Sequence, residues 1–540
     1  MTSNTSNTNE FGQELDGDSL IPTSVGTASL SDLVITQAMF KAESIRRNAG
    51  CQPWVTLGPA DISEVGVTAD TRTNAAVITI TSEQTASALA ASGTGTQADP
   101  YLIKDKNIVF ASGSPGFVLN DPQATYYIRF YNILASGSSN GSSIINMVGF
   151  GTPVAFERCK FQGANGSADE LLAYMTTGSL EMYGCEIAGV SNYCFFGNGT
   201  AAKSVKLTDC IVSGTAKSSV TNGVFYAYGP GEFKVEVTRC LFNSSHFHWH
   251  IGNGWTIEYT MVRDTQISGC AVGIGDLNYL KPGGNIYSQI PNMIQNSHFK
   301  NVRFTYTPYV TQTAVYGNGA DKCVFENCSF DGNVAERRLF EWRRAINVTL
   351  LQCYFQKADG TDNAGNEVCE FWETSGLMVR ECWTDGAPED CYELVMSYGN
   401  NKFIDNVGDN VTGQLVDIFG VGSFDVEIDG VYGDCGDAAV LVTDVDYVRV
   451  RNVFVKQTGI SALGCVVLER RNAAPDVSPK GCVIIGFLSP PEVSSQGLPF
   501  AVDTTQATLP GGIGQNFAAW WEEGELKFYG EPALQRMSLR

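Results

Sequence analysis

The chain has 540 residues, of which 43% are hydrophobic and 17% charged, a composition that supports a large core and excludes a disordered protein. A formal charge of −22 argues against a nucleic-acid partner, because phosphate binding needs clustered Lys and Arg. No apolar run approaches the ~18 residues of a membrane span, and the start MTSNTSNTNEFGQELDGD has no export-signal pattern.

The N-terminal segment is polar over residues 1–20 and then changes character. The stretch SLSDLVITQAMFKAESIRRNAG from Ser29 predicts a helix that begins at a capping Ser or Asp and ends at Gly50. We interpret residues 1–60 as an attachment module and 61–100 as the N-terminal cap of the region that follows. The alternative is that the helix itself caps the first repeat, because an exposed solenoid end has to be covered.

A repeated phrase fills residues 101–490: an alternating strand, a small or polar residue, Cys, any residue, and a large apolar residue. Examples are VAFERCKF, LEMYGCEI and CVFENCSF. The position of the Cys, called the slot here, recurs at intervals of mostly 25 to 31 residues. We assign the slots to Ile108, Ile133, Cys159, Cys185, Cys210, Cys240, Cys270, Ser297, Cys328, Cys353, Cys382, Asn406, Val431, Val453 and Phe487.

Such a period with internal alternation indicates a strand-based solenoid, here an all-β parallel β-helix of about 14 coils. The slot residue and the apolar residue two positions later share one strand face, so the cysteines are expected to stack inside as free thiols. The residue before the slot is often Asn, Asp or Gly, as at Asn327, Asp209 and Gly184, which predicts a tight corner there.

The strand, Asn-type corner and strand pattern, as in VFENCSF, resembles the single-stranded right-handed parallel β-helix superfamily. That superfamily includes pectate lyases, polygalacturonases and bacteriophage tailspikes. The resemblance covers about residues 100–490 and implies the fold. No catalytic signature of a pectin-cleaving family is present, so it assigns no residue a role.

Three of the four histidines, His246, His248 and His250, alternate in SSHFHWHIGNGW. On a strand they would share one face, a geometry able to bind a transition metal. No Cys or carboxylate stands at ligand spacing, so a wet strand or a subunit contact is the favoured interpretation. Cys323 and Cys328 have no matching second pair and make a poor zinc site. We therefore expect no metal and no cofactor.

Four acidic residues align when each coil is counted back from its slot. Glu341 and Glu370 lie 12 residues before theirs, Glu393 lies 13 and Asp417 lies 14 before theirs. Each acid stands between apolar residues, in FEWR, CEFW, YELV and VDIF. We expect an outward row of carboxylates on one sheet, in which like charges repel unless they are compensated.

This row is the candidate catalytic site, because neighbouring coils would bring carboxyl groups to the separations that glycosidases use. Trp372 would lie on the same face as a sugar platform, and Arg343, next to Arg344, could bind an anionic substituent. The alternative is a solvated acidic face on an acidic protein, neutralised partly by these arginines.

The last segment, 491–540, loses the repeat and gathers Trp520, Trp521, Phe528 and Tyr529 on expected strands. We interpret it as a C-terminal β cap or an oligomerisation segment rather than a ligand site.

These features favour a bacteriophage virion appendage, tailspike-like or fibre-like, assembled in the reducing host cytoplasm. We expect a homotrimer that joins other virion proteins through its N-terminal module and binds a host surface polysaccharide. Whether it also depolymerises that glycan stays open, and so does its enzyme class. The alternatives are a non-enzymatic head, neck or collar decoration, and a free polysaccharide lyase or glycoside hydrolase.

Overall fold

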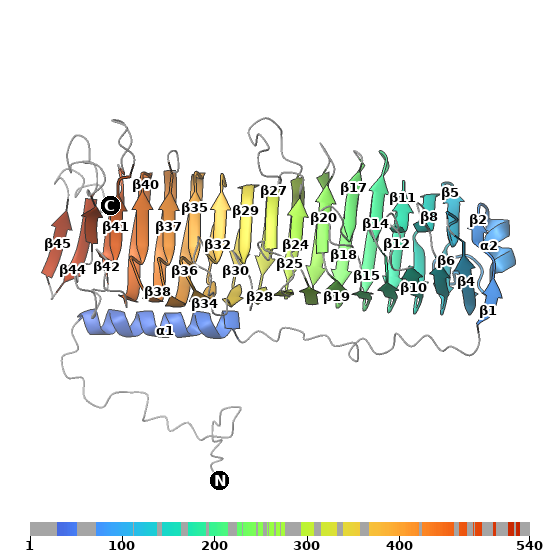
Figure 1. Ribbon diagram of the computed structural model, residues 1–540, viewed down its shortest axis with the longest axis horizontal. Coiled ribbons are helices and arrows are strands. Elements are labelled where there is room, and N and C mark those ends of the chain that lie inside the picture. The colour runs from blue at the N-terminus through green and yellow to red at the C-terminus, as the bar shows by residue number, and fades with distance from the viewer. Residues whose placement is uncertain are drawn as a thin grey trace, which may run out of the picture.

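The computed structural model describes residues 30–50 and 72–529 with gaps, the longest being 164–170, 214–223, 276–292, 307–314, 332–338, 357–366, 472–478, 489–499 and 504–516. Its strands lie side by side along a straight rod (Figure 1). Nearly all strand pairs are parallel and join one coil to the next, so the chain is a parallel β-helix. No helix in the described ranges is long and apolar enough to cross a membrane.

Three ladders of paired strands form the walls of the rod. Ladder 1 consists of β2 (Ile78–Ile80), β5 (Phe117–Asp121), β8 (Ser143–Phe150), β11 (Leu171–Met175), β14 (Phe195–Asn198), β17 (Phe225–Tyr228), β20 (Phe247–Ile251), β24 (Val272–Gly275), the start of β27 (Val315–Glu326), β29 (Phe340–Ile346), β32 (Cys369–Trp372), β35 (Tyr392–Val395), β37 (Val416–Phe419), β39 (Val440–Thr443), β41 (Val466–Glu469) and β43 (Phe500–Asp503).

Ladder 2 follows it in each coil. It consists of β3 (Tyr101–Lys104), β6 (Ile128–Tyr131), β9 (Val154–Glu157), β12 (Gly178–Tyr183), β15 (Lys203–Thr208), β18 (Phe233–Thr238), β22 (Tyr259–Arg263) beside the short β21 (Thr256–Ile257), β25 (Met293–Lys300), the end of β27, β30 (Thr349–Leu351), β33 (Met378–Arg380), β36 (Tyr398–Val411), β38 (Phe424–Cys435), β40 (Asp446–Gln457), β42 (Val483–Leu488) and β44 (Phe517–Glu522).

Ladder 3 closes each coil after the slot. It consists of β1 (Thr73–Ala75), β4 (Lys106–Phe110), β7 (Leu134–Gly137), β10 (Lys160–Gly163), β13 (Glu186–Ala188), β16 (Ile211–Ser213), β19 (Leu241–Ser244), β23 (Gln266–Gly269), β26 (Arg303–Tyr306), β28 (Ser329–Asp331), β31 (Tyr354–Gln356), β34 (Trp383–Ala387) and the ends of the long strands β36, β38 and β40. The ladders thus extend beyond the expected limits 101–490 at both ends. The repeated sequence phrase does not identify β1 and β2, because each of these strands is too short to contain the whole phrase.

The interior is built from every second strand residue. Aromatic rings stack coil upon coil, for example Phe304 on Phe330 at 4.9 Å and Phe330 on Phe355 at 4.7 Å between ring centroids. Because the coil spacing of ~4.8 Å matches the distance between stacked rings, identical side chains at one position pack well against each other. This agreement explains why the sequence repeats its large apolar residues in register.

The slot cysteines line the interior as predicted. The cysteines that the structure describes are all buried and free. Their thiols donate to carbonyl oxygens of the preceding coil, as Cys185 Sγ does to Phe156 O at 3.3 Å. Where Asn406 replaces Cys, its Nδ2 donates to Val379 O at 3.0 Å, so the amide takes over the same contact. The slot therefore accepts a small side chain that donates to a buried carbonyl, although it also holds the purely apolar Ile133 and Val302.

The corner before the slot has the predicted left-handed backbone. The φ angle is +53° at Asp209, +52° at Asn327 and +57° at Gly184. Arg158 and Gln352 adopt it too, with φ values of +51° and +52°. The corner geometry is thus imposed by the coil even where the residue type does not favour it.

Several slot assignments are wrong. Ser297 pairs with Cys323 on ladder 2, and the true slot of that coil is Val302, which precedes β26. Ser297 follows Asn296, whose φ is +48°, so a second corner of the same coil imitates the slot phrase. Cys270 lies outside the described residues, but the pairing of Leu241 with Gln266 places the slot immediately before β23.

Two further slots are displaced at the ends of the repeat. Ile108 pairs with Ala135 and lies two residues past the slot position that Ile133 occupies. Val453 pairs with Leu488 across a register shift, so Phe487 is one residue off. A bulge changes the residue count without changing the apolar character of the strand, which explains the second error.

The predicted N-terminal helix forms as α1 (Leu30–Gly50). It does not cap the first coil, where α2 (Glu83–Leu89) lies against β2 and β3. Instead α1 runs along the C-terminal part of the rod and contacts β34, β36 and β38 (Figure 1). The alternative interpretation, in which this helix caps the first coil, is therefore wrong.

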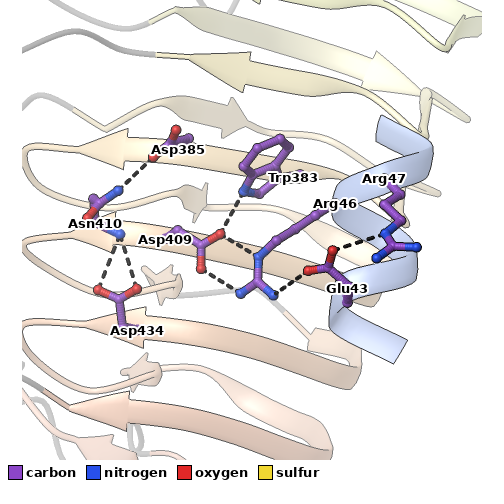
Figure 2. A network of polar contacts seen from close by, with 8 residues as sticks. All are labelled: Glu43, Arg46, Arg47, Trp383, Asp385, Asp409, Asn410 and Asp434. Carbon is purple, nitrogen blue, oxygen red and sulfur yellow. Dashed lines mark hydrogen bonds and ion pairs between the residues drawn. The ribbon is translucent and has the colours of Figure 1, made fainter. Parts of the chain in front are cut away.

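An apolar stripe and an ion-pair network hold α1 in place. Ala38, Ala42 and Ile45 pack against Val407 and Tyr432. Figure 2 shows the polar network, in which Arg46 donates through Nε and Nη2 to the two carboxylate oxygens of Asp409, both at 2.7 Å. Trp383 Nε1 donates to the same carboxylate at 2.8 Å. Two hydrogen bonds in a fixed fork geometry make this a specific docking site.

Replacing Arg46 by Ala should release α1 from the rod, because it removes a bidentate, partly buried charge pair worth about 1.5–3 kcal/mol. Cleavage at Phe40 by a protease specific for aromatic residues should then become at least about tenfold faster, while the rod stays intact. The matched control is Arg47→Ala, since the Arg47 side chain is 73% exposed and pairs with Glu43 on the helix itself. Equal protection of both variants would contradict this account.

The C-terminal segment continues the solenoid before it ends. β44 pairs in parallel with β42, and β45 (Glu525–Tyr529) then pairs with β44 in antiparallel fashion. Trp520, Trp521, Phe528 and Tyr529 lie on these two strands, as expected. The parallel ladder therefore ends in one reversed strand.

Candidate functional site

The four predicted acids form one column on ladder 1. Glu341 pairs with Glu370, Glu370 with Glu393, and Glu393 with Asp417. Each acid is therefore one coil, ~4.8 Å, from the next. The alignment of the four phrases predicted this register correctly.

The column faces outward, because the residues on either side of each acid line the core. Phe340 and Trp342 flank Glu341 and are both fully buried. Even so, Glu341 is only 5% exposed and Glu370 only 1% exposed, whereas Glu393 and Asp417 are partly exposed. The expectation of a solvated acidic face is therefore wrong for the first two acids. These two carboxyl groups lie out of water on the outer side of the wall.

Arg343 and Trp372 lie beside the column, two residues further along the same strands. They pair in register, and the Arg343 guanidinium lies 5.2 Å from the centroid of the Trp372 ring. Arg343 Nε also donates to Glu341 Oε1 at 2.7 Å. Arg344 does not join this group, because it lies at the corner and pairs with Glu373 at 3.0 Å.

Burial and mutual repulsion give the neighbouring acids of the column different pKa values. Burial raises the pKa of Glu393 to about 10, assisted by the charges of Glu367, Glu370 and Asp417 and by a hydrogen bond with Glu370. Burial also raises the pKa of Asp417 to about 7, although Arg471 acts in the opposite direction. At neutral pH Glu393 thus holds a proton while Asp417 is close to half ionised. Two neighbouring acids with such different pKa values are suited to acid and base roles.

The sequence analysis did not identify two buried acids next to the column. Glu367 lies three residues before Glu370, and Asp390 lies three residues before Glu393. Both are buried, and burial together with the charge of Asp417 raises the pKa of Asp390 well above its usual range. The phrases EVCE and DCYE, which lie one coil apart, indicate these two residues, because each phrase begins with an acid three residues before an acid of the column.

One group of three carboxyl groups has the spacing of a cation site. Oxygens of Glu367, Glu370 and Glu393 all lie within 4.8 Å of one another. A hard cation with oxygen ligands would neutralise this group in place of the shared proton.

The histidine cluster is only partly within the described residues. His246 lies outside them. His248 and His250 are on β20, paired with Gly273 and Gly275, so they take equivalent positions on ladder 1. Cys323 and Cys328 are separate interior residues, and Cys328 Sγ donates to Phe299 O at 3.3 Å.

No family model matches this chain, and no curated protein matches it. One solved structure that it matches is tailspike protein 3 of bacteriophage CBA120, with 10% sequence identity and a TM-score of 0.23. The match covers 80% of this chain and 64% of the tailspike, so the chain spans less than two thirds of that protein. The parallel β-helix fold rests on the strand pairings themselves.

Proposed function

We propose that this chain is a tailspike-like or fibre-like virion appendage that binds a host surface polysaccharide along ladder 1 and cleaves it at the acid column. The observation that carries the proposal is the register of Glu341, Glu370, Glu393 and Asp417, with Trp372 and Arg343 beside them. A row of like charges at strand spacing is unfavourable in a purely structural wall. A catalytic role therefore explains this row of acids better than a structural role does.

Hydrolysis of a glycosidic bond needs a proton donor and a second carboxylate. Glu393, protonated at neutral pH, would give its proton to the leaving oxygen. Asp417, one coil away, would act as nucleophile or as base in its ionised form. The coil spacing of ~4.8 Å is near the ~5–5.5 Å between the carboxyl groups of retaining enzymes. Trp372 would stack on a sugar ring, and Arg343 would bind an anionic substituent.

The virion part of the proposal rests on the resemblance to the β-helix superfamily and on the free thiols. Buried, unpaired cysteines suit assembly in a reducing cytoplasm. In this proposal the chain forms a homotrimer, and residues 1–60 join it to other virion proteins. Host polysaccharide is the external partner.

A structural decoration without a sugar site is the second candidate. It is favoured by the burial of Glu341 and Glu370, which leaves these two acids little contact with solvent. In that case the column would be a buried part of the solenoid wall in which neighbouring carboxyl groups share protons.

The two candidates are separated by replacing Glu370 and Glu341 with Gln, singly. Glu370→Gln removes the hydrogen-bonded neighbour that supports the proton on Glu393, so polysaccharide cleavage should fall about tenfold or more with adsorption to host cells retained. Glu341→Gln breaks the pair with Arg343 and should weaken adsorption. Glu236→Gln, on the exposed face of β18, is the control. Unchanged cleavage and unchanged adsorption in both variants would remove the site and favour the decoration.

A further inference from the structure

The helix α1 lies across the same three coils that carry most of the acid column. It contacts β34, β36 and β38 along one edge of the rod (Figure 1). In chain order these strands complete the coils that begin with β32, β35 and β37. Those three strands of ladder 1 bear Glu370, Glu393 and Asp417. Each strand that α1 contacts therefore belongs to the same coil as one acid of the column, but lies on another wall.

A second row of acids lies beneath α1. Asp385 and Asp409 pair in register on ladder 3. Asp434 follows in the next coil, where both of its carboxylate oxygens accept from the backbone N–H of Asn410 at 3.2 Å. Arg46 binds the middle carboxyl group, that of Asp409, with two hydrogen bonds (Figure 2). Burial raises the pKa of Asp434, and the charge of Arg46 acts in the opposite direction. The guanidinium therefore offsets repulsion between acids that lie one coil apart.

The coils beneath α1 contain features that weaken a solenoid. Asn401 is fully buried, and its Nδ2 makes no hydrogen bond among the described residues. The pairing of β36 with β38 has two register shifts, one between Tyr398 and Asn401 and one between Gly408 and Val411. A buried donor without a partner and an interrupted ladder both lower local stability. Repulsion within the acid column acts in the same direction.

The contacts of α1 are distributed over these coils. Its apolar stripe packs against Val407 of β36 and Tyr432 of β38. Lys41 pairs with Asp405 of β36 at 3.1 Å. Gly50, at the end of the helix, lies so close to the ring of Trp383 on β34 that no side chain would fit there. A rigid helix that binds three successive coils resists a change in the spacing between them.

We infer that α1 is a brace for the acid column, and that Arg46 is a positioning residue which acts through it. The brace holds the coils of Glu370, Glu393 and Asp417 at a fixed spacing, although acids repel each other on two walls of the rod. Supporting contacts of this kind keep functional groups in place, and a displacement of ~1 Å can lower a reaction rate about 100-fold. The brace itself is independent of the proposed function, whereas its effect on cleavage rests on that function.

The test measures hydrogen exchange at pH 7 in the full-length protein, with peptides that cover each strand. Arg46→Ala should speed exchange in β32, β35 and β37 about tenfold or more, because the coils of the column are no longer held by α1. The strands β14 and β17, on distant coils, should exchange as in the parent. Arg47→Ala is the matched control, since Arg47 pairs with Glu43 on the helix itself.

Two further variants separate the brace from the loss of a charge. Gly50→Leu keeps every charge but places a side chain against the Trp383 ring, so it should lift the end of α1 and speed exchange most in β32. Arg46→Lys keeps the charge but loses the fork geometry, so its effect should be smaller than that of Arg46→Ala. Cleavage of the host polysaccharide by Arg46→Ala should fall about tenfold, with adsorption to host cells unchanged.

The outcomes distinguish the brace from the proposed function. Faster exchange confined to α1 in both Arg46→Ala and Gly50→Leu would overturn the inference, because the helix would then be a passive attachment. Equal loosening of distant coils would overturn it too, since α1 would then stabilise the whole rod. Full cleavage by a loosened Arg46→Ala variant would remove the positioning role. A parent protein that cleaves no polysaccharide would reject the proposed function, whereas local loosening of β32, β35 and β37 would still support the brace.

Discussion

Replacing Asp417 by Asn is expected to lower the rate of polysaccharide cleavage by a factor of about 10²–10⁴. Asn keeps the shape of the side chain but cannot take up a proton or attack the sugar. Adsorption to the host should persist, since Trp372 and Arg343 are unchanged. The measurement is release of reducing ends from the intact polysaccharide. Asp425→Asn serves as control, because Asp425 is exposed and pairs with Arg449 at the surface.

The pH profile of the same reaction should identify the two acids. The rate should rise with pH through about 7, as Asp417 ionises, and fall near pH 10, as Glu393 loses its proton. Glu393→Gln should remove the alkaline limb from whatever slow reaction remains. A parent enzyme without a limb near 7, or an Asp417→Asn variant of full activity, would assign the chemistry to other residues.

The second large effect concerns stability. The pKa of Glu393 is about 10 in the folded protein and ~4.3 in an unfolded chain. The folded state therefore binds the proton more tightly, and the stability it contributes is fully present below pH ~4 and lost as the pH rises toward 10. Asp417 acts in the same sense up to about pH 7. The column should make the rod less stable in alkaline solution.

Glu393→Gln keeps the side chain neutral at every pH, so it should raise the midpoint of thermal unfolding at pH 9 by on the order of a few degrees. At pH 4 the variant and the parent should unfold at nearly the same temperature. Scans with EDTA remove any cation from Glu367, Glu370 and Glu393, and Glu236→Gln controls for a lost surface charge. A variant that is destabilised at pH 9 would contradict this account, because it would show that the ionised Glu393 carboxylate is favourably paired in the folded protein.

Local sequence patterns were sufficient to predict the fold, because every coil favours the same kinds of residue at its slot and at its corner. A buried slot beside a carbonyl accepts Cys or Asn, and a left-handed corner favours Asn, Asp or Gly. The same locality caused the errors. Ser297 has a left-handed Asn before it and an apolar residue two positions after it, so a second corner looks like a slot. Only the pairing of coils distinguishes the two.

The acid column was predictable in register but not in environment. Strand alternation places Glu341 and Glu370 on the outer side of the wall, whereas their burial depends on how much of the chain covers that face. The docking of α1 has no local signal at all. Arg46 and Asp409 are 363 residues apart in sequence, and neither lies in a motif that predicts the other as its partner. Contacts of this kind follow from the whole fold.

The most direct test is a crystal structure of the Asp417→Asn variant soaked with an oligosaccharide of the host polysaccharide. The account predicts a sugar ring against Trp372, with a glycosidic oxygen within hydrogen-bond distance of the Glu393 carboxyl group and the neighbouring residue extending along ladder 1. A sugar bound elsewhere on the rod, with the column from Glu341 to Asp417 closed and unchanged, would contradict it.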